Sequence, residues 1–427
     1  MLITAIGIAV FLIITFASSI HGIGLLLFLM IIHGTLVTFF GESATHLPFY
    51  CALAVAAAIF GQGSWKFFKF NHAIIFISLV LIMALSSAFG INQGNSLDNL
   101  LLYGKGFVLA LLVAGTIRSL NDYKIVSAYC LIGGLIGATM ALYQYKTGTY
   151  YISSIYEQRA AGLRGDPNDT AALLVACLPF SVYWLVTVRR LPLKILLTFG
   201  TLSLIAGLAL TASRGGMVAL AMVSAVFLFK HPRPSAFIGI TIAALFILAA
   251  APQQMWNRFE SIWTGDVQHG ASSFRGRLEL LNDGANILLE HPLLGVGVGN
   301  FPAARQRLGS AHGTPLIGTE KSSHVAHNLY LEFFAETGFL GGSLLIVLLL
   351  ICLKGLSKLS RNSESDRFFN ISDAFYFSLL ALLFSGLFLS QGKSSVLWFI
   401  IGIALSAWTL NKPVTPPLAY PRVQLRK

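Results

Sequence analysis

The stretch AHNLYLEFFAETGFLGGSLLIVLLLICLKGLSK, Ala326 to Lys358, begins with polar residues and continues as a long apolar run that ends among lysines. An apolar run of about 20 residues crosses roughly 30 Å of hydrocarbon when it is helical. A helix also hydrogen bonds all of its backbone groups internally, which a bilayer demands. The stretch therefore predicts a membrane-spanning helix with a polar entrance.

The rest of the chain has the same character. Of its 427 residues, 56% are hydrophobic and 11% are charged, and the mean hydropathy is +0.75. Soluble domains contain about 25% charged residues. We therefore predict an all-α polytopic membrane protein with about 12–13 transmembrane helices. The expected spans are residues 2–18, 22–40, 48–62, 72–89, 99–117, 123–143, 168–188, 191–211, 215–230, 235–251, 328–354, 371–390 and 394–411.

The net charge of +12 is concentrated in short loops between apolar runs. These loops are rich in Lys and Arg and poor in acids, a pattern typical of cytoplasmic loops: WKFFKFNH, VRRLPLK, FKHPRP and LKGLSKLSR. A nucleic-acid surface would interleave basic and aromatic residues on a polar face, which the sequence lacks, so no nucleic-acid partner is expected. The first apolar run leads directly into the next, and we expect a membrane helix there rather than a cleaved signal peptide.

This topology divides the chain into four regions. Residues 1–251 are predicted to form the N-terminal transmembrane helices and residues 328–411 the C-terminal ones, with residues 412–427 as a cytoplasmic tail. Residues 252–327 form a large loop on the outer face, with six basic and six acidic residues. A neutral loop of this length is too long for a simple connector.

Two short patterns stand out within that loop. RGRLELLNDGANILLEHP has apolar residues at helical spacing before a proline, which predicts one amphipathic helix. The following HPLLGVGVGNF contains a Gly-x-Gly-x-Gly run. It neither follows a strand nor opens a helix, so we predict a tight turn that folds the loop back rather than a dinucleotide site.

Arginines on the predicted outer face are candidate ligands for a phosphate group. Arg214, in TASRGG, lies within one turn of an apolar span, where it must snorkel, pair or line a cavity. Gly215 and Gly216 permit close approach, and a guanidinium suits a phosphate or pyrophosphate. Arg275 and Arg277 lie just ahead of the predicted amphipathic helix. Either arginine can be a solvated surface residue, and Arg277, in phase with that helix, is favoured.

Two histidines at the polar entrance, His324 and His327, have the spacing i, i+3. On a helix they would share a face and could hold a metal. However, no third ligand lies at suitable spacing, so no metal and no other cofactor is expected. A neutral imidazole there can instead cap the helix, or it can accept a proton from a hydroxyl group.

A further polar group, Asp166, Asn168 and Asp169 in GLRGDPNDTAALL, precedes a span and is typical of a helix cap. No Asp-x-Asp pair lies on the predicted outer face, which argues against a sugar transferase that binds a divalent cation. The four cysteines lie within apolar runs without Cys-x-x-Cys spacing and are interpreted as packing residues.

Taken together, these motifs resemble the O-antigen ligase superfamily of bacterial inner-membrane proteins. The resemblance is carried by LTASRGG, GRLELLNDGANILLEHPLLGVGVGNF and AHNLYLEFFAETGFLGG, which together cover residues 200–345, and by GDPNDTAALLVACLP upstream. The order and spacing of the motifs make the match specific. The predicted span count exceeds the usual one of the family, and the difference lies in residues 1–40.

The resemblance implies a GT-C-type bundle that transfers a glycan without a metal or a nucleotide sugar. The donor would be a glycan on undecaprenyl pyrophosphate, and for a ligase the acceptor would be lipid A-core at the periplasmic face of the inner membrane. The essential histidine of the family falls on His327 and its arginines on Arg214 and Arg277. Arg275 is a further candidate for the pyrophosphate, and His324, Asp166 and Asn168 are supporting positions.

Other functions are compatible with the same residues. An O-antigen or exopolysaccharide polymerase, or a protein O-oligosaccharyltransferase, would use the same chemistry on a different acceptor. A lipid or glycan transporter would instead use Arg214 as a gate. Transporters usually carry paired, broken spans in matching halves with polar groups at mid-membrane. This sequence gathers its polar groups on one face, which favours a transferase.

Overall fold

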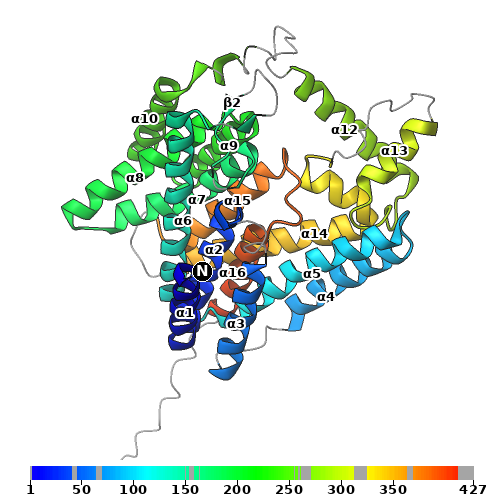
Figure 1. Cartoon of the computed structure of the whole chain (residues 1–427), viewed down its shortest axis with the longest axis horizontal. Helices are drawn as coiled ribbons and strands as arrows, with labels where there is room; N and C mark the ends of the chain where they lie inside the picture. Colours follow the sequence, from blue (N-terminus) through cyan, green and yellow to red (C-terminus); the bar gives the residue numbers. More distant parts are fainter. Residues whose placement is uncertain are drawn as a thin grey trace, which may run out of the picture.

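The computed structural model describes residues 2–40, 46–63, 70–149, 151–152, 158–162, 164–253, 255–257, 260, 271–311, 325–362 and 369–411. Nearly all of these residues are helical (Figure 1). The helices before the long loop are α1 Leu2–Ala17, α2 Ser19–Phe40, α3 Leu47–Gly61, α4 Phe70–Ala88, α5 Gln93–Thr116, α6 Leu120–Thr147, α7 Pro167–Thr187, α8 Leu191–Leu210, α9 Arg214–Lys230 and α10 Pro234–Ala250. The later helices are α12 Ala271–Glu290, α13 Phe301–Ala311, α14 Leu329–Arg361, α15 Ile371–Ser385 and α16 Ser395–Leu410.

Each of the thirteen predicted spans coincides with one of these helices. Five helices of the described chain, α5, α6, α7, α8 and α14, are long and apolar enough to cross a membrane by length and composition. Six other helices contain shorter apolar segments of 10–17 residues. The prediction of an all-α polytopic membrane protein is confirmed, and the protein is a multi-pass membrane protein.

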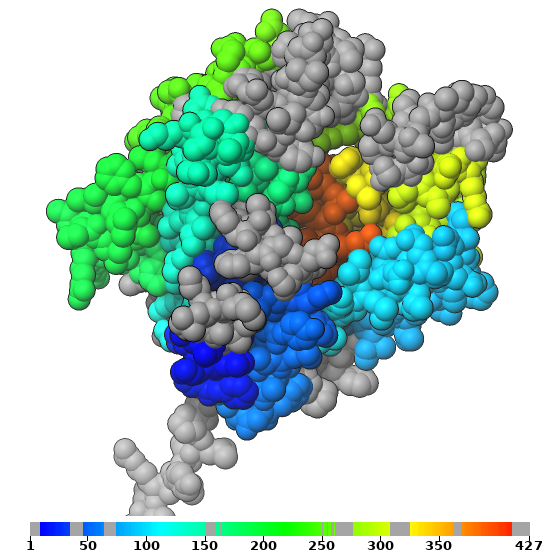
Figure 2. Space-filling model, in the orientation of Figure 1, coloured from blue at the N-terminus to red at the C-terminus, as the bar shows by residue number. Residues whose placement is uncertain are grey.

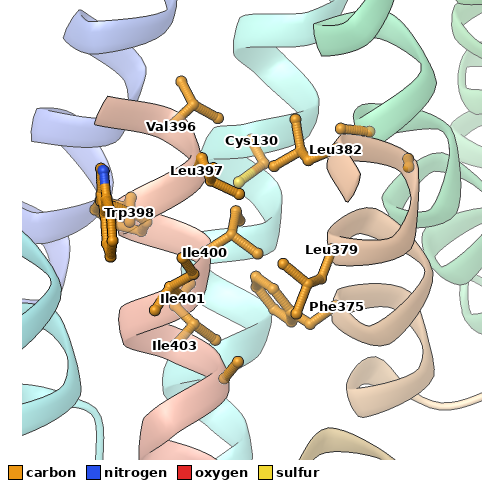
Figure 3. Close-up of a cluster of buried hydrophobic side chains, with 14 of the residues drawn as sticks. Cys130, Phe375, Leu379, Leu382, Val396, Leu397, Trp398, Ile400, Ile401 and Ile403 are labelled. Carbon is orange, nitrogen blue, oxygen red and sulfur yellow. The ribbon is translucent and has the colours of Figure 1, made fainter. Parts of the chain in front are cut away.

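The core is organised around α16, which lies near the middle of the bundle (Figure 1). Residues Val396 to Ala407 are all buried, so this helix is apolar on every side, as expected for a helix surrounded by others. Figure 3 shows its Leu397 and Ile400 facing the α15 residues Phe375 and Leu379. The four cysteines are buried and free, which agrees with their interpretation as packing residues.

The start of α14 is separated from its long apolar part by a break at Gly338, whose φ is 66° and ψ is −172°. A side chain at this position would collide with the carbonyl of Leu293. The amide of Phe339 donates to the carbonyl of Pro292 over 2.7 Å. Because glycine occupies the break, the loop after α12 can pack directly onto α14.

The Gly-x-Gly-x-Gly run forms the predicted tight turn. Gly295, Gly297 and Gly299 all have positive φ angles, between 68° and 97°. The turn is bonded to α14 through the amide of Gly297, which donates to the carbonyl of Glu336 over 3.0 Å. It is also bonded to the α4–α5 connection, where the amide of Ile91 donates to the carbonyl of Val296 over 2.9 Å. The long loop is thereby folded back onto the helices.

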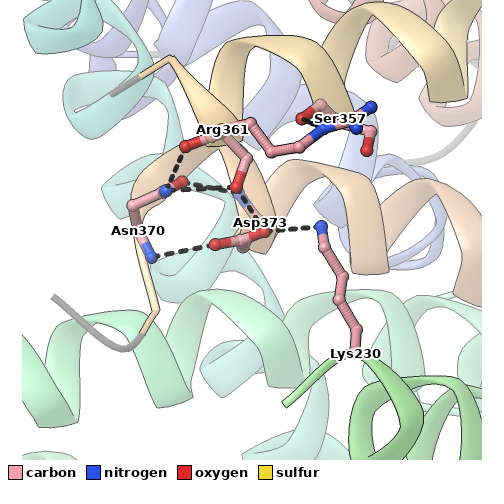
Figure 4. Close-up of polar contacts among 6 residues, drawn as sticks. Lys230, Ser357, Arg361, Asn370 and Asp373 are labelled. Carbon is pink, nitrogen blue, oxygen red and sulfur yellow. Dashed lines mark hydrogen bonds and ion pairs between the residues drawn. The ribbon is translucent and has the colours of Figure 1, made fainter. Parts of the chain in front are cut away.

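At the C-terminal end of α9, a polar cluster joins α9, α14 and α15 (Figure 4). Asp373 of α15 accepts hydrogen bonds from Lys230 Nζ over 2.7 Å and from Ser360 Oγ over 2.7 Å. Asn370 and Asp373 form a capping box at the start of α15. The pKa of the neighbouring His231 is lowered, because the effect of burial outweighs the opposing effect of Asp373. We call Lys230, Ser360, Asn370 and Asp373 the Asp373 cluster.

Two features differ from the sequence predictions. The long loop contains short helices, as predicted for the fold class, but the sequence pattern located only the amphipathic one; the second, α13, was not located because its 11 residues are too short to give a clear period. In addition, β1 (Tyr151–Ile152) and β2 (Gln158–Arg159) form a two-residue antiparallel pair before α7. This pair leaves the fold class unchanged but positions Arg159.

Candidate functional site

The starts of α7 and α9 meet the segment between α15 and α16 at a small pocket, which we call the helix-start pocket. Its free volume is about 10 Å³, room for about one water molecule. A larger ligand requires the walls to move apart. Figure 2 shows the orange part of the chain, which includes this segment, within a recess beside the yellow start of α14. The pocket is lined by Asn168, Ser213, Gly215, Gly216, Arg277, Ser385, Phe388 and Leu389.

A hydrogen-bonded corner fixes the starts of α7 and α9 relative to each other. Asn168 Oδ1 accepts hydrogen bonds from Ser213 Oγ over 2.9 Å and from Arg159 Nη2 over 2.8 Å. Arg159 Nε also donates to the carbonyl of Thr211 over 3.0 Å. Arg159 is buried, with 6% of its surface exposed. This guanidinium therefore holds the corner in place. No pattern in the sequence indicated this role, apart from the polar character of the segment before α7.

Asp166 is the N-cap of α7, as predicted. Its Oδ1 accepts hydrogen bonds from the amides of Asn168 over 2.7 Å and Asp169 over 3.1 Å, and Pro167 occupies the first turn. The capping interpretation is thereby confirmed for Asp166. Asn168 has a further role, because its side chain reaches the pocket.

Arg214 is the first residue of α9, and Ser213 is its N-cap, accepting from the amide of Gly216 over 3.3 Å. A helix start presents N–H groups and a partial positive charge, which favours anions. A side chain at Gly215 would meet Phe388, and one at Gly216 would meet Ala171. The two glycines therefore give the helix start close contact with neighbouring segments of the protein itself.

Arg277 lines the pocket, but the prediction that both arginines lie ahead of the amphipathic helix was wrong. Helix α12 begins at Ala271 and includes Arg275 and Arg277. The side chain of Arg275 lies outside the described part of the structure.

His327 does not lie on a helix, so the condition under which the two histidines would share a helical face is not met. It directly precedes Asn328, the N-cap of α14, whose Oδ1 accepts from the amides of Tyr330 and Leu331 over 3.0 Å each. His327 is therefore not the residue that caps the helix. His324 lies outside the described residues.

The start of α14 is bonded to the segment that lines the pocket. Asn328 Nδ2 donates to the carbonyl of Leu387 over 3.1 Å, and the amide of Leu329 donates to the carbonyl of Gly386 over 2.7 Å. These bonds place His327 next to the segment between α15 and α16. His327 and the helix-start pocket are thus brought together by the fold, although they are far apart in sequence.

Backbone strain is concentrated at this site. Among the described non-glycine residues, two have positive φ angles, Ala212 at 47° and His327 at 49°. Each directly precedes the N-cap of a helix. A non-glycine residue in this region costs about 1–2 kcal/mol, and such residues cluster at functional sites.

A comparison with known protein families identifies this region. The family model described as O-antigen ligase matches residues 199–346. Residues 199–346 are therefore similar to the O-antigen ligase domain. The matched O-antigen ligase domain contains Arg214, Arg277 and His327. No curated protein matches the chain.

Two other residues of the O-antigen ligase domain are buried carboxylic acids that the sequence analysis missed. Glu332 and Glu336 lie on the first turns of α14, with 6% and 2% of their surfaces exposed. Their spacing of four residues within an apolar run was the available signal, because charged residues in a span are usually functional or paired. Among the described residues, no group of three or more His, Cys, Asp or Glu side chains could hold a metal.

A larger, open cavity of about 830 Å³ lies between the α4–α5 connection and α13. Its polar walls include Asn92, Gln93, Gln306 and Arg307. The nearby Asn300 is fully buried, and its Nδ2 donates to Ser96 Oγ over 2.9 Å. This network fixes the α4–α5 connection against the O-antigen ligase domain.

Proposed function

We propose that this protein is an O-antigen ligase. It transfers a glycan from undecaprenyl pyrophosphate to a sugar hydroxyl of lipid A-core at the periplasmic face of a bacterial inner membrane. The main support for this proposal is that several of the candidate residues lie close together. Within one matched O-antigen ligase domain, the start of α9 and Arg277 line one pocket, and the residues after His327 are bonded to the segment that forms its wall.

His327 acts as the general base in this proposal. A sugar hydroxyl is a weak nucleophile, and an imidazole has a pKa near the working pH, so it can remove the hydroxyl proton as the oxygen attacks. The new bond joins that oxygen to the anomeric carbon of the donor glycan, while the bond from this carbon to the pyrophosphate oxygen breaks. The anomeric configuration inverts in a single displacement, and no covalent enzyme intermediate is needed.

Arg214 and Arg277 stabilise the leaving undecaprenyl pyrophosphate, and Arg275 is a further candidate. Negative charge develops on the bridging oxygen as the bond breaks, and guanidinium groups placed in advance lower the energy of that state. The starts of α7 and α9 add the positive ends of two helix dipoles. The reaction needs no metal, because the leaving group is already a good one and cations of the protein neutralise it.

The periplasmic location is supported by charge. Lys and Arg are concentrated in the connections at the opposite ends of α8, α9 and α14 from the pocket, as expected for cytoplasmic loops. A site at the membrane surface can receive a lipid-linked donor sideways from the bilayer. A span count of thirteen would place the two chain ends on opposite sides of the membrane.

The lipopolysaccharide of a strain that lacks this protein tests the proposal. A ligase deletion is expected to leave lipid A-core without long glycan chains while lipid-linked polymer accumulates, because chain synthesis continues without transfer. A band with a single repeat on lipid A-core would instead identify a polymerase. An unchanged ladder together with loss of glycan from a protein would identify a protein O-oligosaccharyltransferase.

A further inference from the structure

Beside the helix-start pocket lies a group of buried polar atoms whose hydrogen-bonding capacity is unused within the described chain. They are Glu332 Oε2 on α14 and Ser385 Oγ and Gln391 Oε1 on the segment that leads from α15 to α16. A buried polar atom without a partner costs about 1–3 kcal/mol, so folded proteins contain few of them. Three such atoms on two neighbouring segments indicate a partner that is not part of this chain.

Three contacts tie these atoms to one place. The hydroxyl of Ser390 hydrogen bonds to the carboxyl group of Glu332, and the ammonium group of Lys393 lies near it. Ser385 lines the helix-start pocket together with Arg277. The carbonyl of Gly386, the residue after Ser385, accepts from the amide of Leu329 at the start of α14. Ser385 therefore lies in the pocket wall, and the other unused atoms lie on the same segment and on the adjoining start of α14.

The neighbouring Glu336 provides an internal comparison. It lies one turn after Glu332 on the same helix and is equally buried. Its Oε1 accepts from the amide of Phe301 over 3.3 Å, and the backbone of Gly299 also bonds to it. The start of α13 and the glycine turn thus supply hydrogen-bond partners for the buried carboxyl group of Glu336. Glu332 differs, because one of its two carboxyl oxygens, Oε2, has no hydrogen-bond partner in the described chain.

The chemistry of the unused atoms selects the ligand. A carboxylate oxygen and an amide oxygen only accept hydrogen bonds, and serine hydroxyls can do so. The missing partner must therefore donate. A sugar hydroxyl donates one hydrogen bond and accepts others, whereas a pyrophosphate only accepts and would be repelled by Glu332. The anion and the sugar are thus suited to different walls of the same pocket.

We propose that Glu332, Ser390 and Gln391 form a subsite for the hydroxyl groups of the acceptor sugar. Glu332 also accepts a hydrogen bond from the backbone N–H of Ala326, the residue before His327. The subsite is therefore joined directly to the turn that carries the base. An acceptor sugar held by Glu332 lies where its attacking hydroxyl can reach His327, while the donor pyrophosphate occupies the arginine side of the pocket.

This inference rests on the proposed ligase function. The test uses the full-length protein in nanodiscs with two probes isolated from a strain that lacks it, lipid A-core and the undecaprenyl-pyrophosphate-linked glycan. Initial rates are measured with each probe varied while the other is saturating. The variants are Glu332→Gln, which keeps an oxygen for Ala326, and Ser390→Ala. The matched control is Ser378→Ala on α15, because Ser378 Oγ is also buried without a partner in the described chain but lies two turns deeper in the helix.

We expect Glu332→Gln to raise the KM for lipid A-core about tenfold or more, and Ser390→Ala to raise it about threefold. The donor KM should change by less than about twofold in both variants, and Ser378→Ala should behave as wild type. An unchanged acceptor KM in both variants, or an equal rise in the donor KM, overturns the subsite. Should Glu332→Gln not fold, as judged by size exclusion and thermal unfolding, Ser390→Ala decides the outcome.

His327→Ala in the same assay separates the two proposals. Full transfer by His327→Ala overturns the proposed chemistry whatever Glu332 does. Loss of transfer in His327→Ala, combined with a wild-type acceptor KM in Glu332→Gln and Ser390→Ala, overturns the subsite alone.

Discussion

The polar clusters at the two ends of α9 differ in how completely their hydrogen-bonding groups are paired. At its C-terminal end, every polar side-chain group of the Asp373 cluster has a partner, and the charges of Lys230 and Asp373 lie 2.7 Å apart. At its N-terminal end, the helix-start pocket is bordered by arginines and by buried oxygens that the described residues leave without partners. The two strained non-glycine residues, Ala212 and His327, also lie at this end.

We infer from this difference that the Asp373 cluster has a structural role and that the helix-start pocket has a functional one. A satisfied polar network fixes a unique arrangement of helices. Strain and unused hydrogen-bonding capacity lower stability, and they persist where a ligand supplies the missing interactions. Substitutions in the pocket should therefore reduce transfer more than stability, and substitutions in the Asp373 cluster should do the reverse.

The largest effect is expected for His327→Ala. Removal of a general base lowers rates by about 100- to 10,000-fold, and transfer in a reconstituted assay should fall by this amount. Thermal unfolding should be little changed, because the N-cap of α14 is Asn328. Retained transfer would exclude His327 as the base.

Arg214→Lys should lower transfer by about 100-fold or more, because an ammonium group cannot replace the forked hydrogen bonds of a guanidinium to a pyrophosphate. The matched control is Arg305→Lys on α13, whose Nε donates to Asp283 Oδ2 over 2.6 Å at a partly exposed site. We expect this control to keep its activity. Wild-type transfer in Arg214→Lys would indicate that Arg214 only anchors α9 at the membrane surface.

Asp373→Ala should act mainly on stability. The change leaves Lys230 without its partner and removes the capping box of α15, which we expect to cost about 2–4 kcal/mol. The measurement is the Tm of the purified protein, with kcat determined per folded molecule. The double variant Lys230→Met, Asp373→Leu should recover much of the loss, since no unpaired charge remains. A kcat that falls with an unchanged Tm would contradict the structural role.

Ala212→Gly should raise stability by about 1 kcal/mol, because glycine adopts positive φ without the steric cost that alanine incurs. The Tm of the variant checks this value. A lower Tm would mean that Ala212 is not strained. If the strain also positions Ser213 and Arg214 for the donor, the donor KM should rise in the same variant.

Treatment with EDTA is expected to have no effect on transfer, because in the proposed mechanism Arg214 and Arg277 neutralise the leaving group in place of a divalent cation. The measurement is the initial rate before and after chelation, with Mg²⁺ and Mn²⁺ added back in parallel. A strict requirement for either ion would revive a metal-dependent mechanism.

Much of the fold could be predicted because the bilayer imposes a simple rule on the sequence. Each of the thirteen apolar runs that were predicted as spans corresponds to a helix. The glycines at 295, 297 and 299 indicated the tight turn. The short helix α13 and the break at Gly338 could not be predicted, because both depend on contacts with distant segments. The break is explained only by the loop at Leu293 that packs against it.

The candidate site was predictable in its charged residues but not in its arrangement. Arg214, Arg277, Asp166 and His327 stand out because polar residues next to apolar spans need a reason. The position of α12 relative to its two arginines was predicted wrongly, because helix boundaries are poorly marked in a polar loop. The roles of Asn168 and Arg159 emerged only from the hydrogen bonds that join β2, α7 and α9.

The sequence by itself determined that this chain is a helical membrane protein with a region similar to O-antigen ligases, because apolar length and motif order are local properties. The tertiary structure decided which polar residues meet. It brought Arg277, Ser213 and the segment after α15 to one pocket, and it placed His327 beside them through bonds to Gly386 and Leu387. It also distinguished Glu332 from Glu336, two similar residues in one motif, because only packing determines which buried oxygen already has a partner.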